Sequence, residues 1–222
     1  MTEESFGPHQ LLQVHQEQVP GDFSARRRIA EAMRTLSERL IRMEAEPDEL
    51  EEWAGQLEAL VEQMGDRPRR SARDANRRMF SGQASREDIF DMMDFDPVDG
   101  GSNPIAPGIR WDREDDTGVE GEVWLGERYQ GPPGRVHGGV IAWIMDAVLS
   151  RSMHVAKRIG VTGTLTVRYM APTRIGVPLR CSAHLERIEG RKMFIHGAIH
   201  HDDVQTVHAE GIFFQPEFMV ER

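Results

Sequence analysis

Cysteine is almost absent from this sequence. The chain of 222 residues has a single cysteine, Cys181, so it cannot form an internal disulfide or a cysteine-rich zinc site. No apolar run reaches the roughly 18 residues that a membrane-spanning helix needs. The acidic, polar start MTEESFGPHQ is unlike a secretory signal peptide. We therefore expect a soluble, cytoplasmic protein without a membrane span.

Positive charge is also scarce. The chain has 27 Lys and Arg against 37 Asp and Glu, a formal net charge of −10, which argues against a binder of nucleic acid or anionic membranes. Residues 1–107 contain 13 basic and 22 acidic side chains, whereas residues 108–222 contain 14 and 15. The chain therefore divides into an acidic first half and a nearly neutral second half.

The first half predicts two helices. Residues 1–23 have no sustained period, and we expect a flexible tail there. Ser24 is a candidate N-cap, Pro47 suits the first turn of a second helix, and Gly65 suits its end. Each helix has apolar residues at alternating spacings of four and three: Ile29, Met33, Leu36, Leu40 and Met43, then Leu50, Trp53, Leu57, Leu60 and Met64. We expect an antiparallel hairpin that serves dimerisation or packing, because its acidity disfavours a helix-turn-helix DNA reader.

The hairpin belongs to a predicted helical extension over residues 24–95. Its stretch from Arg67 to Arg78 has six arginines, which we interpret as a solvated linker or helix face, the alternative being a site for a polyphosphate ligand. Ser85 is predicted to cap a short helix that reaches Phe95. Residues 96–107 are rich in proline and glycine and are predicted to be a linker.

The second half changes from helical to strand-like periodicity. Strands are predicted at 118–125, 161–170, 178–188, 191–200 and 204–214. Between the first two, residues 140–149 are apolar on every side, which predicts a helix that is buried all round. This order predicts an α+β domain over residues 108–222, in which a curved antiparallel sheet wraps around one long helix.

Asp146 is the only charged residue between His137 and Arg151. Burying an unpaired carboxylate is costly, so we interpret Asp146 as a functional group, although a structural Asp remains the alternative. The sequence His137-Gly138-Gly139 lies where the helix begins, and free amides there favour negative charge. Nine residues of helix rise about 13.5 Å, so Asp146 and these amides act on one atom only if they come from two chains. This spacing predicts a homodimer with a shared site.

The run GPPGRVHGGVIAWIMDAV at 131–148 resembles the HGG-helix-Asp signature of hotdog-fold acyl-CoA thioesterases of the PaaI-like family. Its GPPG start is similar to the branch that contains the mammalian mitochondrial long-chain acyl-CoA thioesterases. Residues 161–172 and 189–194 are similar to the same branch. The resemblance covers roughly 117–216, about half of the chain, and implies a hotdog fold and the hydrolysis of acyl-CoA thioesters in a homo-oligomer, either a dimer or a dimer of dimers.

The resemblance also implies roles for single residues. Asp146 would be the catalytic carboxylate, as nucleophile or as general base, and the Gly138 amide beside His137 would polarise the thioester carbonyl. Thr162 matches a residue that positions the water or the carboxylate. No cofactor and no metal are implied. Some relatives have an Asn where this chain has Gly131.

Further residues are expected to contact the substrate. Gly139 lies in the same glycine-rich start of the helix, and Gln130 is beside the position of that Asn. Relatives have basic residues after the tyrosine of the third strand, where this chain has Met170 and Ala171. The coenzyme A phosphates are therefore expected to bind Arg174, Arg191 or Lys192.

Other chemistries fit the sequence less well. His196, His200, His201 and His208, with Asp202 and Asp203, suggest metal ligands, but we interpret them as polar side chains of an exposed hairpin. There is no G-x-S-x-G motif, and Cys181 has no nearby base. Two alternatives to an acyl-CoA thioesterase remain on the same fold: a non-hydrolytic acyl-CoA sensor or regulator, and a structural protein.

Overall fold

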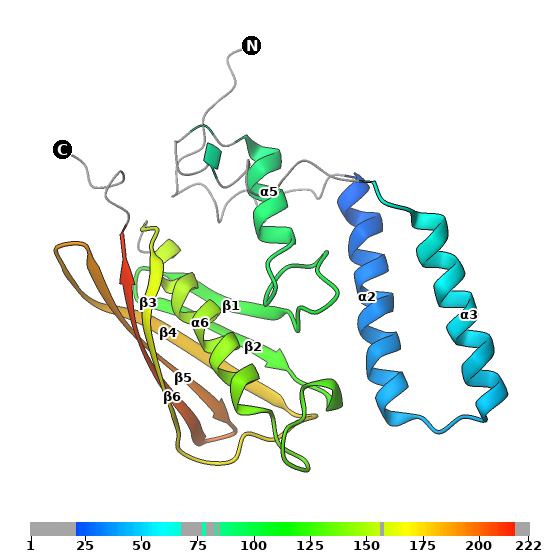
Figure 1. The fold of residues 1–222 in the computed structure, drawn as a ribbon. Helices are drawn as coiled ribbons and strands as arrows, with labels where there is room; N and C mark the ends of the chain where they lie inside the picture. Colours follow the sequence, from blue (N-terminus) through cyan, green and yellow to red (C-terminus); the bar gives the residue numbers. More distant parts are fainter. Residues whose placement is uncertain (1–20, 68–76, 79–82, 84, 156–157, 216–222) are drawn as a thin grey trace.

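A computed structural model describes residues 21–67, 77–78, 83, 85–155 and 158–215 (Figure 1). Residues 1–20 of the predicted tail and most of the arginine-rich stretch lie outside the described residues, and the last three residues of that tail, 21–23, are helical instead. The helices are α2 (Gly21–Arg42), α3 (Pro47–Met64), α5 (Arg86–Asp94) and α6 (Gly138–Val155), with a 3-10 helix η2 (Glu127–Tyr129). The strands are β1 (Ile109–Asp115), β2 (Gly118–Trp124), β3 (Val161–Tyr169), β4 (Pro178–Glu189), β5 (Lys192–His201) and β6 (Val204–Phe214).

The strands form one antiparallel sheet in the order β1-β2-β4-β5-β6-β3. All five predicted strands are confirmed to within one residue at each end. β1 was missed, because five of its seven residues are charged and its sequence IRWDRED gives no clear alternation. It lies at an edge of the sheet, where polar residues are tolerated, and pairing with β2 rather than local preference places it.

Helix α6 packs along one face of this sheet (Figure 1). Ile144, Met145, Val148 and Leu149 are fully buried against the sheet. Gly197 of β5 permits the close approach, because a Cβ there would lie 2.8 Å from the Met145 Cε and 2.9 Å from the Leu149 Cδ2. The predicted α+β arrangement, a sheet around one long helix, is confirmed.

The expectation that this helix is buried all round is wrong for a single chain. Trp143, Asp146 and Ala147 lie on the other side of α6 and are only half-buried. One sheet covers one side of a helix, and the described part of this chain covers the opposite side only partly. The helix is also longer than the predicted 140–149, since it begins at Gly138 and ends at Val155.

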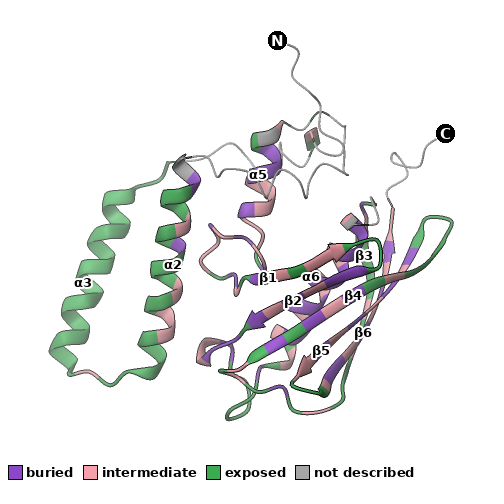
Figure 2. Ribbon diagram, turned by 180° about the vertical axis from the view of Figure 1, so that it is seen from behind, coloured by how far each residue is buried: buried purple, intermediate pink, exposed green. Residues whose placement is uncertain are grey.

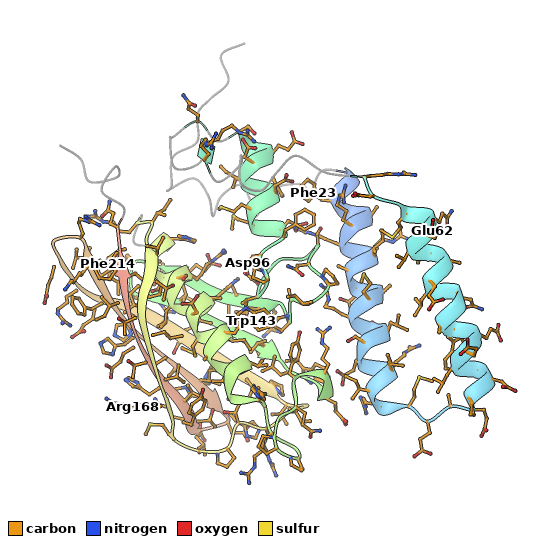
Figure 3. All side chains as sticks on the ribbon, viewed as in Figure 1. Phe23, Glu62, Asp96, Trp143, Arg168 and Phe214 are labelled. Atoms are coloured by element: carbon orange, nitrogen blue, oxygen red, sulfur yellow. The ribbon has the colours of Figure 1, made fainter. Side chains whose placement is uncertain are left out.

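The N-terminal helices form the predicted antiparallel hairpin beside the β1 and β2 end of the sheet (Figure 1). Pro47 begins α3 and Gly65 ends it, as predicted. Helix α2 begins at Gly21 rather than after Ser24, because the fully buried Phe23 already packs on Phe90 of α5 with ring centroids 5.7 Å apart (Figure 3).

Helix α5 is held by a network of charges. Ser85 caps it as predicted, its Oγ accepting the Asp88 amide at 3.2 Å. The Arg78 Nε donates to Asp88 at 2.7 Å, and this guanidinium holds the pKa of the Asp88 carboxyl far below its usual range. Arg78, the last of the six arginines, is therefore engaged by a carboxylate.

Asp94 at the end of α5 is completely buried, and it binds Arg27 of α2 through a 2.7 Å bond and also accepts the Ser102 hydroxyl. Asp99 accepts the Trp111 indole N–H of β1 at 2.6 Å. The segment from Asp94 to Asp99 is thus bonded both to helix α2 and to strand β1.

Candidate active site

The start of α6 is organised by His137. Its carbonyl accepts the amides of Val140 and Ile141 at 3.0 and 3.1 Å, and its imidazole Nδ1 accepts the Gly139 amide at 3.0 Å. The amide of Gly138 precedes the first helical hydrogen bonds and has no acceptor among the described residues. The Gly138 amide is therefore available at the positive end of the helix. The Gly139 amide, which was expected to bind substrate, donates to the His137 imidazole instead.

Asp146 lies two turns further along α6. It is half-buried, not buried as expected, because it faces away from the sheet. Its Oδ1 accepts a 2.9 Å hydrogen bond from the Thr162 hydroxyl of β3. The structure thus brings these two predicted residues together.

Strand β3 contacts α6 at the start and near the middle of the helix. Thr162 at its start bonds to Asp146, and the Tyr169 hydroxyl at its end donates to the Gly138 carbonyl at 2.7 Å. The residue after Thr162 is Gly163, at an irregularity in the pairing of β3 with β6. A Cβ at Gly163 would lie 2.2 Å from the Phe214 ring.

Within one chain, Asp146 and the Gly138 amide do not meet. Eight residues of α6 separate them, a rise of about 12 Å. A hydrogen-bond donor for an oxyanion must lie about 3 Å from the oxygen that a nucleophile at the same carbon generates. One chain therefore presents two half-sites, one at the start of its α6 and one near the middle of that helix.

Several close contacts hold the loop over residues 130–137, which precedes α6 and is called the clamped loop below. The Tyr129 carbonyl accepts the His137 amide at 2.9 Å. Gln130, expected to contact substrate, instead accepts the Gly134 amide through its Oε1 at 2.6 Å. Gly131 packs so closely that a Cβ there would lie 2.8 Å from the His137 Cα. The loop has no room for a side chain at position 131 without rearranging.

The basic residues expected to bind coenzyme A lie at two ends of the sheet. The backbone of Arg174 forms an isolated antiparallel β-bridge with that of Arg135 in the clamped loop. Both residues line an open hollow of about 560 Å³ beside His201. Arg191 and Lys192 lie at the turn between β4 and β5, where the Arg191 Nε donates to the Gln215 carbonyl at 3.1 Å and the Lys192 Nζ lies 5.9 Å from the Phe214 ring centre. Arg174 is on the Gly138 side, and the other two are on the Thr162 side.

The histidines of the second half lie mainly on the sheet face away from α6. Ligand atoms of His196, His208 and Glu210 lie within 4.8 Å of one another. His196 Nε2 is 2.7 Å from Glu186, and His208 Nε2 is 3.2 Å from Glu210. These groups already pair with carboxylates and are separated from Asp146 by the sheet.

Cys181 is completely buried in β4 and its thiol donates to the Gly121 carbonyl at 3.3 Å. Burial raises the pKa of this thiol to about 12, so it is protonated at neutral pH. A thiol nucleophile is thereby excluded at this position.

Sequence reasoning missed two residues that position the candidate site. Tyr169 lies in the stretch 161–172 that is similar to the thioesterase branch, but nothing in the sequence predicted its hydrogen bond to Gly138. Glu38 of α2 accepts the Glu127 and Arg128 amides at 2.9 and 3.3 Å, and so caps η2, which leads into the clamped loop. Its 89-residue separation from Glu127 leaves no local signal.

The known proteins that this chain resembles are thioesterases. The family model described as "Thioesterase superfamily" matches residues 133–208. The mouse protein named acyl-coenzyme A thioesterase THEM4 is 34% identical over 85 residues, which cover 38% of this chain and 36% of that protein. The human acyl-coenzyme A thioesterase THEM5 is 32% identical over 92 residues, 40% of this chain and 37% of that protein. The chain spans little more than a third of the length of these curated relatives.

One solved structure matches most of the chain, and a second matches little more than half of it. A crystal structure of a thioesterase superfamily protein is 30% identical, with a TM-score of 0.73, and the match covers 88% of this chain and 97% of that chain. Zebra fish thioesterase superfamily member 2 has a TM-score of 0.50 at 17% identity and covers 58% of this chain and 94% of its own. In the described part of the chain, no helix is long and apolar enough to cross a membrane. The match with the first of these structures, over nearly all of its length, places the chain in the thioesterase superfamily, with the hotdog fold that the sequence predicted.

Proposed function

We propose that this protein hydrolyses acyl-CoA thioesters to a free acid and coenzyme A, at a site that two chains build together. The observation that carries the proposal is the half-buried Asp146, bonded to Thr162, on the side of α6 that faces away from the sheet. The names of the mouse and human relatives indicate the acyl-CoA substrate class. The family membership supports the reaction class.

The chemistry follows from the two half-sites. Hydrolysis of a thioester needs a base or nucleophile at the carbonyl carbon and a donor aimed at the oxygen that gains charge. Asp146 supplies the first, either by attacking the carbon or by removing a proton from water. The Gly138 amide, at the positive end of α6, supplies the second. Thr162 holds the carboxylate in one orientation through its hydroxyl.

Strand β3 indicates how two chains meet. It is an edge strand, and its Val161, Tyr169 and the following Met170 are 52 to 62% exposed. An edge strand with exposed apolar side chains favours pairing with another strand. If two copies pair their β3 strands antiparallel about a two-fold axis that passes between Leu165 and Thr166, Thr162 of one chain lies beside Tyr169 of the other. Because Thr162 contacts Asp146 and Tyr169 contacts Gly138, this pairing brings Asp146 towards the partner's Gly138.

The same arrangement gives the coenzyme a place to bind. The hollow lined by Arg135 and Arg174 lies beside the clamped loop, at the Gly138 end of α6. Guanidinium groups bind phosphates through paired N–H donors. We assign this hollow to the phosphates of coenzyme A, so that the thioester reaches the interface between the chains.

The test is a thiol-release assay with purified protein and a panel of acyl-CoAs of different chain lengths, aromatic acyl groups included. We expect thiol release by the unaltered chain and a loss of at least 100-fold in kcat for Asp146→Asn. The matched control is Asp112→Asn, an exposed carboxylate on β1, which keeps full activity. Equal rates for Asp146→Asn and the unaltered chain would refute the assignment of Asp146, and tight acyl-CoA binding without turnover would refute hydrolysis.

A further inference from the structure

The helical hairpin exposes two apolar stripes. On α2 the stripe is Ile29, Met33, Leu36, Leu40 and Met43, and on α3 it is Leu50, Trp53, Leu57, Leu60 and Met64; all ten are 36 to 58% exposed. Helix α3 has no buried residue at all, and Figure 2 shows it exposed along its length. A water-soluble helix normally buries such a stripe.

The other side of α2 is already occupied. Phe23 and Ala30 are buried towards the rest of the chain, Arg34 donates to the Asn103 carbonyl at 2.8 Å, and Glu38 caps η2. These contacts fix α2 along most of its length, so its stripe cannot turn inward. The stripe faces away from the sheet as a fixed feature of the fold.

The pattern of both stripes suits a bundle of helices. Spacings alternating between three and four residues are the a and d positions of a heptad repeat. Two helices that face each other leave their shared stripe open on one side, whereas four helices enclose it. A second hairpin is therefore the smallest addition that buries all ten residues.

Charge identifies the second hairpin as a copy of the same one. Helix α2 has six arginines, of which Arg27 and Arg34 bind Asp94 and Asn103 on its inner side, and three acidic residues. Helix α3 has six acidic residues and no basic residue. A two-fold arrangement sets α2 of one chain against α3 of the next, so that opposite charges flank the apolar stripes. We propose that two copies of this chain pack their α2–α3 hairpins stripe to stripe into a four-helix bundle.

The hairpin lies at the opposite end of the sheet from β3. It sits beside β1 and β2, whereas β3 is the last strand at the other edge (Figures 1 and 2). The hairpin contact is therefore separate from the contact at β3, which rests on the proposed function. With both two-fold contacts formed about axes that intersect at right angles, four chains close into a dimer of dimers.

The test compares two substitutions on α3 by light scattering after size-exclusion chromatography of the full chain. Leu57→Glu places a charge in the stripe, and Ala59→Glu makes the same change in charge at an exposed position on the other side of α3. We expect the unaltered chain and Ala59→Glu to have the mass of four chains, and Leu57→Glu to have the mass of two.

Two further measurements keep the result decisive. Circular dichroism checks that Leu57→Glu stays helical, and Leu57→Gln repeats the change without charge and is expected to give the same halved mass. An unchanged mass in both Leu57 variants, or an equal loss in Ala59→Glu, would overturn the proposal. Because mass is measured without substrate, this outcome is independent of thiol release, and loss of thioesterase function alone would leave the bundle standing.

Discussion

Replacing Glu38 with alanine removes the contact that joins the helical hairpin to the segment before the candidate site. The Glu38 carboxylate accepts the backbone amides of Glu127 and Arg128 at 2.9 and 3.3 Å, and its side chain is only 16% exposed. Gly126, the residue before η2, lies so close to Glu38 that a Cβ on Gly126 would be 2.5 Å from the carboxylate oxygens.

The expected loss follows from the kind of bond removed. A side-chain cap of a helix start contributes about 0.5 to 2 kcal/mol, and a hydrogen bond to a charged group about 1.5 to 3 kcal/mol. The longer bond to Arg128 is the weaker of the two, so we expect Glu38→Ala to lower the free energy of unfolding by about 2 to 3 kcal/mol.

Urea denaturation at one protein concentration measures this loss. The control is Glu31→Ala on the same helix, because Glu31 is 67% exposed and pairs only with Arg34 among the described residues. Exposed pairs of this kind contribute less than about 1 kcal/mol. Equal stabilities for the two variants would refute the claim that Glu38 connects the hairpin to the rest of the fold.

Three further predictions concern α6 and its partners. Thr162→Val is expected to lower kcat about tenfold or more with little change in KM, whereas Thr117→Val in the exposed turn between β1 and β2 is without effect; equal kinetics would contradict the bond to Asp146. Tyr169→Phe removes the bond to the Gly138 carbonyl and is expected to reduce kcat/KM about three- to tenfold, with an unchanged rate as the contrary result. Burial lowers the pKa of His154 to about 4, and the unfolded chain takes up this proton below pH about 6.5. The free energy of unfolding should therefore fall by up to about 3 kcal/mol between pH 6.5 and 4 in the unaltered chain, and the fall should be smaller by that amount in His154→Leu; parallel pH profiles would contradict it.

The sequence predicted the parts of the fold that local patterns determine. Alternating strands, the capping Ser85 and the break at Pro47 each depend on residues a few positions apart, and all three are confirmed. Strand β1 was missed because its place depends on pairing with β2 rather than on its own residues. The start of α2 was misplaced because the contact of Phe23 with α5 outweighs a capping signal at Ser24.

In the candidate site, too, the sequence predicted what local patterns determine and missed what long-range contacts determine. The glycine-rich start of α6 and the isolated charge of Asp146 are visible in one short run, and from that spacing a site between two chains was predicted. The bond of Tyr169 to Gly138 spans 31 residues, and that of Glu38 to Glu127 spans 89. Such contacts depend on how β3 and α2 dock on the rest of the chain, which no local pattern records. The burial expected for Asp146 was wrong because a uniformly apolar helix does not reveal which side a single sheet will cover.

The central claim, a site with Asp146 from one chain and the Gly138 amide from another, is tested most directly by mixing two inactive variants. Asp146→Asn removes the carboxylate function, and Gly138→Pro removes the amide at the first position of α6, where a helix accepts proline. Each variant alone is expected to be inactive in the thiol-release assay. When both are produced together in equal amounts, about a quarter of the sites combine an intact Asp146 with an intact Gly138 from the other chain. We predict about a quarter of the wild-type rate for the mixture, and a mixture as inactive as its two components would contradict the shared site.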